Sequence, residues 1–274
     1  MPLPPERIYG DELQITFVNH STVLIQTQGL NLLTDPIWSD YCGPVPIISP
    51  KRYRNPGLPF NQLPKIDAVL VSHSHYDHLD LPTLKQLWER DQPTFFVGLG
   101  NQSLLKNVGI DNVQAMDWWQ SYSLTPTTTV IGTPAQHWSR RSVLDHNKRL
   151  WMGFLVTTPG GNLFFAGDTA MGPHFHMLRK RFGPMRFSAL PIGAFEPRWF
   201  MKGSHISPQE AVDIHRLLES TTSLAIHFGT FRLGTDGQFE AVESLKQART
   251  ANKIDKSEFL ILEFGETRLL PKAH

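Results

Sequence analysis

The stretch His73-Ser-His-Tyr-Asp-His78 decides the fold of this chain of 274 residues. It follows Asp67-Ala-Val-Leu-Val71, a short apolar run that is typical of a buried strand. The stretch offers three imidazoles and one carboxylate, and these groups suit zinc and related divalent ions. An open catalytic zinc normally takes three protein ligands, so the fourth one favours two metals. The alternative is a polar surface loop that happens to be rich in histidine.

Three further candidate ligands each follow a predicted strand at its carboxyl end. They are His137, Asp168 and His227, which come after the apolar runs 131–136, 163–167 and 224–226. In open α/β architectures, ligand sites gather at this end of the strands. Any one of the three, taken alone, is more often a core or capping residue. Together with the first stretch they give five His and two Asp, enough for two metal sites that share one Asp.

Strands outnumber helices in the predicted order of elements, and helices recur between them. A capping box, Ser207-Pro-Gln-Glu210, predicts a helix over 208–219, and Asp80 is expected to cap a helix that follows the metal-binding stretch. The proline-rich stretch 36–64 is expected to be a long surface loop. Strands are predicted at 13–18, 22–27, 30–34, 67–71, 94–97, 113–115, 129–135, 152–158, 162–166, 187–191, 222–227 and 258–262.

A weak internal repeat relates two of the predicted hairpins. Residues 24–32 can be laid on residues 155–163, and the hairpins lead to Asp35 and Asp168, respectively. We therefore expect a single domain over 1–274, built from two halves that meet near 125–150. The alternative is that two unrelated hairpins share the same turn chemistry.

Composition limits the partners and the compartment. Lys and Arg total 26 against 25 Asp and Glu, so the formal charge of +1 gives no global field to recruit nucleic acid. The single cysteine, Cys42, excludes an internal disulfide and Cys-rich zinc sites, and fits a reducing compartment. The N-terminal sequence does not have the pattern of a signal peptide. We expect a cytoplasmic protein.

The chain resembles the metallo-β-lactamase superfamily and, within it, the N-acyl-phosphatidylethanolamine-hydrolysing phospholipase D family and its bacterial relatives. The resemblance covers residues 14–264 and includes the HxHxDH pattern at 73–78. It implies an α/β fold, the four-layer αββα sandwich of that superfamily. Its most specific parts are Leu33-Thr-Asp-Pro-Ile-Trp-Ser39, Gln136-His-Trp-Ser-Arg-Arg141, Asn147-Lys-Arg-Leu-Trp151, Ala166-Gly-Asp-Thr169, Pro191-Ile-Gly-Ala-Phe-Glu-Pro-Arg-Trp-Phe-Met201 and Ile226-His-Phe-Gly-Thr230.

The resemblance also implies a ligand set and a reaction. Two Zn²⁺ ions are expected, and Mn²⁺ or Fe are alternatives because they accept the same donors. The reaction would cleave an N-acylated phosphatidylethanolamine to phosphatidic acid and an N-acylethanolamine, with a metal-bridging hydroxide attacking phosphorus. One ion would be held by His73, His75 and His137, the other by Asp77, His78 and His227, with Asp168 bridging.

Two residues are expected to assist this catalytic centre beside Asp168. Asp35 is a candidate to accept the second ring N–H of a metal-bound histidine, or else it simply caps the turn before Pro36. His205 matches a family histidine near the reacting phosphate, where it would bind the phosphate or protonate the leaving alkoxide. The alternative for His205 is a surface histidine that precedes a helix cap.

Cationic and aromatic residues alternate in two segments and are candidates for substrate contact. They are Arg140, Arg141, Arg198 and Trp199, which would meet a lipid phosphate and its acyl chains. The alternative places the aromatic residues in the core and the arginines on a solvated face. The other histidines that match no ligand position are expected to be structural or exposed: His146, His174, His176, His215 and His274.

The sequence thus predicts a zinc-dependent phosphodiesterase of phospholipase D type. A lactonase or a hydrolase of a soluble phosphodiester keeps the same metals, and a metal-binding protein without turnover is the alternative of another class. The expected partner is a phospholipid or another phosphodiester, with peripheral contact to a membrane. Nucleic acid is not expected, because no basic domain is present. The oligomeric state is left open, and a homodimer is compatible with the sequence.

Overall fold

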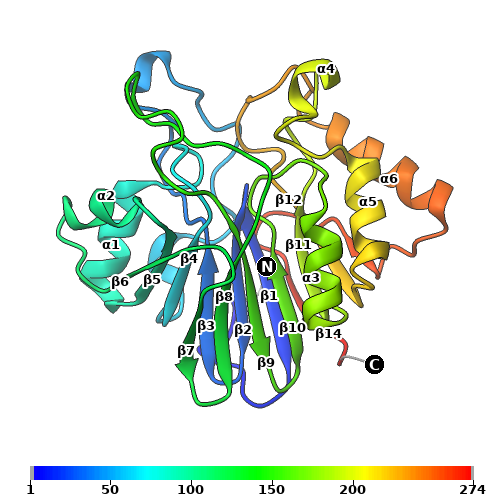
Figure 1. Cartoon of the computed structure of the whole chain (residues 1–274), viewed down its shortest axis with the longest axis horizontal. Helices are drawn as coiled ribbons and strands as arrows, with labels where there is room; N and C mark the ends of the chain where they lie inside the picture. The colour runs from blue at the N-terminus through cyan, green and yellow to red at the C-terminus, as the bar shows by residue number, and fades with distance from the viewer. Residues whose placement is uncertain (1–2, 273–274) are drawn as a thin grey trace.

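The computed structural model describes residues 3–272, which form two seven-stranded sheets packed face to face with helices outside them (Figure 1). His274 lies outside the described residues. The first sheet has the order β14 (Thr267–Leu270), β1 (Leu13–Asn19), β2 (Thr22–Thr27), β3 (Leu30–Thr34), β4 (Ala68–Val71), β5 (Thr94–Gly98), β6 (Val113–Met116). The second has the order β13 (Phe259–Leu260), β12 (Thr222–Ile226), β11 (Phe187–Pro191), β10 (Gly161–Phe165), β9 (Gly153–Thr158), β8 (Thr128–Thr133), β7 (Ser121–Thr125).

Helices cover the outer face of each sheet, which confirms the expected four-layer α/β sandwich (Figure 1). Those beside the first sheet are α1 (Leu81–Asp91) and α2 (Gln102–Lys106). Those beside the second sheet are α3 (His174–Phe182), α5 (Pro208–Leu217) and α6 (Glu240–Asn252). Within residues 3–272, no helix is long and apolar enough to cross a membrane.

Alternation along the strands divides the apolar side chains between two cores. In β4, Leu70 faces the layer between the sheets, whereas Val69 and Val71 pack with α1. Successive residues of a strand point to opposite faces, so a strand covered on both sides must be apolar throughout. Fully buried phenylalanines of both sheets, such as Phe17 and Phe187, fill the central layer. Each contributes about 1.5–3 kcal/mol by leaving water.

The two sheets repeat one pattern of strand pairing. In each, an antiparallel hairpin (β2 with β3, β9 with β10) is followed by three parallel pairings. The hairpins end just before Asp35 and Asp168, so both acids lie at the same end of the sandwich. The chain passes from the first sheet to the second between Met116 and Ser121.

Some elements differ from the sequence-based expectation. Strands β7 and β14 were not predicted, because β7 is a largely exposed edge strand and β14 pairs with β1 across nearly the whole chain. The proline-rich stretch contains two short 3₁₀ turns, η1 (Pro46–Ile48) and η2 (Phe60–Gln62). Asp80 precedes α1 as expected, but its carboxylate accepts hydrogen bonds from Ser39 and Thr83 instead of capping a helix N–H. The capping box at Ser207 is present.

Candidate metal centre

All seven predicted ligands lie at one end of the sandwich, where strands of both sheets reach their carboxyl ends. The loop 73–78 follows β4 of the first sheet, and the other three ligands follow β8, β10 and β12 of the second. Because these strands run in the same direction, their carboxyl ends bring side chains that are far apart in sequence into one cluster. His75 is half-buried, and the other six ligands are buried: His73, Asp77, His78, His137, Asp168 and His227.

Three histidines converge in the first group of ligands. Nε2 of His73 lies 2.8 Å from Nδ1 of His75, and Nε2 of His137 lies 3.2 Å from the same Nδ1. One nitrogen of each ring therefore points to a common place, as a tetrahedral metal with one open position requires. The outer nitrogen of His137 is held by the carbonyl of Ser204, at 2.9 Å.

The second group contains both carboxylates. Oδ2 of Asp77 lies 3.1 Å from Nε2 of His78 and 3.4 Å from Nε2 of His227. Oδ2 of Asp168 lies 3.3 Å and 3.1 Å from the same two nitrogens, and 3.9 Å from Nε2 of His137. Asp168 thus stands between the two groups of ligands.

The electrostatics of this cluster are compatible with metal binding. Burial lowers the pKa of His73 well below its usual value and that of His75 to about 4, so these rings are neutral ligands. Burial alone would also lower the pKa of His227, but the carboxylates of Asp168 and Asp77 raise it to about 9. The second group therefore attracts positive charge, for which metal ions compete with protons. Nε2 of His78 and of His227, both buried, has no hydrogen-bond partner among the described residues. The cluster is able to bind metal.

Asp35 lies directly behind the second group. Its Oδ2 is 2.6 Å from Nδ1 of His78 and accepts a hydrogen bond from Oγ of Ser72, while its Oδ1 accepts the backbone N–H of Ser72 at 2.7 Å. Burial raises the pKa of Asp35 although His78 and Ser72 lower it. The carboxylate is placed where it can fix the ring orientation of His78 and direct Nε2 into the cluster.

Replacing Asp35 by asparagine is expected to weaken metal binding by about 10- to 100-fold, because the ring of His78 would lose its carboxylate partner. Metal titration of the stripped protein and kcat/KM would both report the loss. Asp67→Asn is a suitable control, since Asp67 pairs with Arg7 at 2.6 Å at the opposite end of β4. If Asp35→Asn matched the wild type in metal affinity and kinetics, Asp35 would only stabilise its turn.

A cavity of about 800 Å³ opens beside the cluster. His205 lines it, with Nδ1 at 3.8 Å from Oδ2 of Asp168, and burial lowers the pKa of His205 to about 4. The ring is therefore neutral near pH 7 and suited to hydrogen bonding with a substrate oxygen. Arg140 brings a cationic group to the lining. The apolar part of the wall is formed by Trp138, Phe200, Met201 and Leu233.

Of the four predicted substrate residues, only Arg140 lines the cavity. The Arg141 guanidinium donates to the carbonyls of Ser74 and Leu79, so it braces the metal-binding loop from behind. Arg198 donates to the carbonyl of His205 and pairs with Glu210, and it therefore holds the segment that carries His205. Both guanidiniums therefore have protein partners. Trp199 is 78% exposed on α4 (Arg198–Met201) and stands outside the cavity lining, which includes Arg140.

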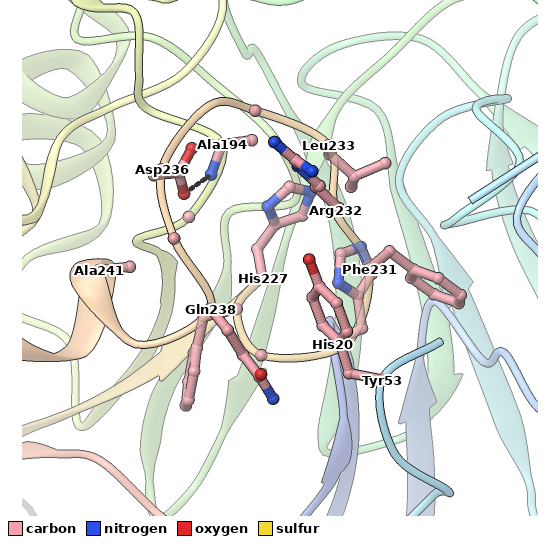
Figure 2. Close-up of a pocket in the computed structure, with 15 residues that line it drawn as sticks. His20, Tyr53, Ala194, His227, Phe231, Arg232, Leu233, Asp236, Gln238 and Ala241 are labelled. Carbon is pink, nitrogen blue, oxygen red and sulfur yellow. Dashed lines mark hydrogen bonds between the residues drawn. The ribbon is translucent and has the colours of Figure 1, made fainter. Parts of the chain in front are cut away.

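Two histidines outside the predicted ligand set lie at or beside the cluster. His146, expected to be structural or exposed, is exposed and lines the cavity, where the centroid of its ring lies 5.7 Å from that of Trp138. His20 is buried in the turn between β1 and β2, and its Nε2 lies 2.9 Å from Oδ2 of Asp77. Figure 2 shows the rings of His20 and His227 side by side at the small pocket enclosed by the loop that carries Phe231 and Asp236. His174 and His215 are buried elsewhere in the second half and bond to Thr169 and Ser223.

Comparisons with known proteins agree with this geometry. A family model described as "Beta-lactamase superfamily domain" matches residues 30–228. The chain is 36% identical to N-acyl-phosphatidylethanolamine-hydrolyzing phospholipase D 1 of Caenorhabditis elegans, over 96% of this chain and 79% of that protein. It is 38% identical to the mitochondrial enzyme of that name from Saccharomyces cerevisiae, over 84% of this chain but 50% of the yeast protein. An isothiocyanate hydrolase from Delia radicum gut bacteria shares the fold, with a TM-score of 0.74 at 18% identity over 93% of this chain and 98% of that chain.

Proposed function

Because the chain belongs to the β-lactamase superfamily, and is a metallo-hydrolase of the family that includes the N-acyl-phosphatidylethanolamine-hydrolysing phospholipases D, we propose that it cleaves the phosphodiester bond of an N-acylated phosphatidylethanolamine or a similar phospholipid. The products would be phosphatidic acid and an N-acylethanolamine. The observation that supports this proposal most is the cavity of about 800 Å³, which joins a cluster of His and Asp to an apolar wall. A phospholipid presents the complementary groups: an anionic phosphate for the metal-loaded cluster and apolar chains for the apolar wall.

The proposed reaction assigns roles to the residues of the chain. Two divalent ions would supply an activated water and neutralise charge on the phosphoryl oxygens. We propose zinc, because imidazole and carboxylate donors with an open position are typical of catalytic zinc; manganese and iron accept the same donors. Arg140 is proposed to bind the phosphate, and His205 to form a hydrogen bond with a phosphoryl or leaving oxygen. The wall that contains Trp138 and Phe200 would receive an acyl chain.

A turnover assay on N-acyl-phosphatidylethanolamine in mixed micelles tests the substrate. The metal-replete protein is expected to release phosphatidic acid and N-acylethanolamine, identified by mass, and the metal-stripped protein is expected to release neither. A panel of lactones and a soluble phosphodiester run in parallel separate the alternatives. Strong turnover of either with none of the lipid would replace the lipid assignment, and no turnover of any substrate would favour a metal-binding protein.

Replacing His205 by alanine is expected to lower kcat/KM by about 100-fold, at the lower end of the range for a residue that assists proton transfer or charge stabilisation. Its ring faces the cavity 3.8 Å from Asp168, so its loss would remove a hydrogen-bond partner from the reacting group. His176→Ala on the exposed side of α3 serves as the control. Wild-type kcat and KM for His205→Ala would leave His205 a structural residue.

We further propose that the protein docks on a phospholipid surface with the mouth of this cavity. Three segments around the mouth expose apolar side chains: the segment of η1, the loop 139–150, and α4. Figure 1 shows η1, in light blue, and α4 at the same end of the molecule. Arg140 and Lys202 are exposed beside them and complement anionic lipid. The exposed apolar side chains of these three segments are here called the rim. They are Val45, Ile48, Val143, Leu144, Trp199 and Phe200, each 46–82% exposed. We propose that the protein is cytoplasmic and makes peripheral contact with the membrane.

The double variant Leu144→Ser/Trp199→Ser is expected to bind vesicles of phosphatidylcholine and phosphatidylglycerol at least about tenfold more weakly, since burying one such side chain contributes about 1.5–3 kcal/mol. Neither residue lines the cavity, so turnover of a short-chain, monomeric substrate should not change. Phe239→Ser is the matched control, because Phe239 is 63% exposed at the start of α6, outside the rim. Equal vesicle binding by both variants in a sedimentation assay would remove the rim as the docking surface.

A further inference from the structure

Two histidines of the centre have a backbone conformation that side chains rarely adopt. His20 has φ +45° and His227 has φ +61°. Residues other than glycine in this left-handed region cost about 1–3 kcal/mol and persist where the surrounding structure fixes them. Here the N–H of His227 donates to the carbonyl of His20 at 2.7 Å. This bond joins the β1–β2 turn of the first sheet to the end of β12 in the second.

The surroundings of His20 fix it from several sides. Its backbone N–H donates to Oγ1 of Thr230 at 2.9 Å, and the Phe231 ring meets its imidazole edge-on at 5.4 Å. The imidazole ring lies 4.3 Å from that of His227 (Figure 2). With 1% of its surface exposed, His20 has little freedom to move. The ring is held in one orientation, with Nε2 toward the carboxylate of Asp77.

The direction of the hydrogen bond between His20 and Asp77 is fixed when Asp77 acts as a metal ligand. A carboxylate that binds metal carries no proton, so the imidazole of His20 must donate its Nε2–H to Oδ2, at 2.9 Å. Asp77 is then restrained in the way that outer hydrogen bonds generally restrain metal-binding carboxylates. The other ligands whose rings neighbour His20 are His227, at 4.3 Å between ring centroids, and His78, at 5.3 Å, and both belong to the same group. None of His73, His75 and His137 forms a hydrogen bond with His20 among the described residues.

We propose that His20 is a positioning residue for the second metal position alone: its imidazole orients the carboxylate of Asp77, and its carbonyl fixes the backbone of His227. The strained turn has a role under this proposal, because it delivers both contacts from a single residue. The proposal concerns metal binding and does not depend on which substrate the protein cleaves. It predicts an unequal effect of His20 on the two ions.

Titration of the metal-stripped protein with Zn²⁺ or Co²⁺, followed by metal analysis and the Co²⁺ absorption spectrum, tests the proposal. The wild type is expected to bind two ions. His20→Ala is expected to bind the first with unchanged affinity and the second about 10- to 100-fold more weakly. His20→Gln retains an amide donor and should recover part of that loss. His215→Gln is the matched control, because His215 is equally buried and bonds to Ser223 far from the ligands.

The outcomes separate positioning from other roles. Two ions bound by His20→Ala with wild-type affinity would overturn the proposal, and so would equal weakening of both ions. A His20→Gln variant as defective as His20→Ala would make His20 a direct ligand instead. If His20→Ala does not fold, Thr230→Val removes the hydroxyl that holds the backbone of His20. For Thr230→Val, a loss of affinity confined to the second ion, and smaller than that expected for His20→Ala, supports the proposal. Wild-type affinity for both ions contradicts it.

Discussion

Replacing Asp168 by alanine is expected to abolish detectable turnover, with a loss of more than about 100-fold, since outer-shell changes alone cost about 10- to 100-fold. Oδ2 of Asp168 lies within 3.3 Å of two histidine nitrogens in the second group and 3.9 Å from His137 in the first. A side chain in that place would be a ligand of both ions, so both affinities should fall together. Metal analysis of the purified variant alongside its kcat/KM measures this.

The matched control for this variant is Asp111→Ala, an exposed carboxylate before β6. Loss of a single ion from Asp168→Ala would assign Asp168 to one metal position and contradict the bridging role. Two ions bound with wild-type turnover would remove Asp168 from the centre altogether. The stripped wild type, reconstituted with Zn²⁺, provides the reference for full occupancy.

Replacing Gly193 by alanine is expected to lower turnover by about 100-fold, the loss that a displacement of roughly 1 Å at a catalytic group can cause. A Cβ on Gly193 would stand 2.0 Å from the carbonyl oxygen of His227. The clash is with backbone, so no rotation of a side chain relieves it, and the end of β12 must shift. The shift would move His227 away from Asp77 and Asp168, and occupancy of the second metal position should fall.

Gly237→Ala controls for the loss of a glycine in the same region, because its new Cβ would meet only ordinary contacts at 3.9–4.0 Å. Overpacking typically costs 1–3 kcal/mol, so thermal unfolding of both variants should be measured beside metal content. If Gly193→Ala kept two ions and full turnover, β12 would be able to yield without disturbing His227. A loss of stability without a loss of metal would show that the shift is absorbed away from the centre.

The clustering of the predicted ligands could be expected from sequence alone because these residues obey a local rule. Each follows a short apolar run, and the carboxyl ends of parallel strands share one edge. His20 obeys no such rule: it stands alone in a turn, and its partner Asp77 is 57 residues away. Most strands and helices could likewise be predicted, because their sequences show the local periodicity of each element. β14 escaped prediction because only pairing with β1, as in Leu13 with Leu270, makes it a strand.

The cavity wall was less predictable, since it depends on which loops meet. Trp138, Phe200 and Leu233 come from three separate segments, and no spacing in the sequence relates them. The contacts of the arginines were also not predictable from the sequence. The composition of their segments suggested contact with substrate, but Arg141 and Arg198 have backbone carbonyls within reach that take up their donors. A guanidinium can donate to a phosphate or to backbone carbonyls, and only the folded chain determines which acceptors are near.

The division of the ligands between the two sheets couples metal binding to folding. Four of them follow β4 in the first sheet and three follow strands of the second, so each bound ion would link the two halves of the sandwich. A ligand that binds only the native state adds RT ln(1 + [L]/Kd) to its stability, and an unfolded chain would scatter these seven donors. The free-metal concentration around the protein would therefore set part of its free energy of unfolding, in addition to its proposed role in turnover.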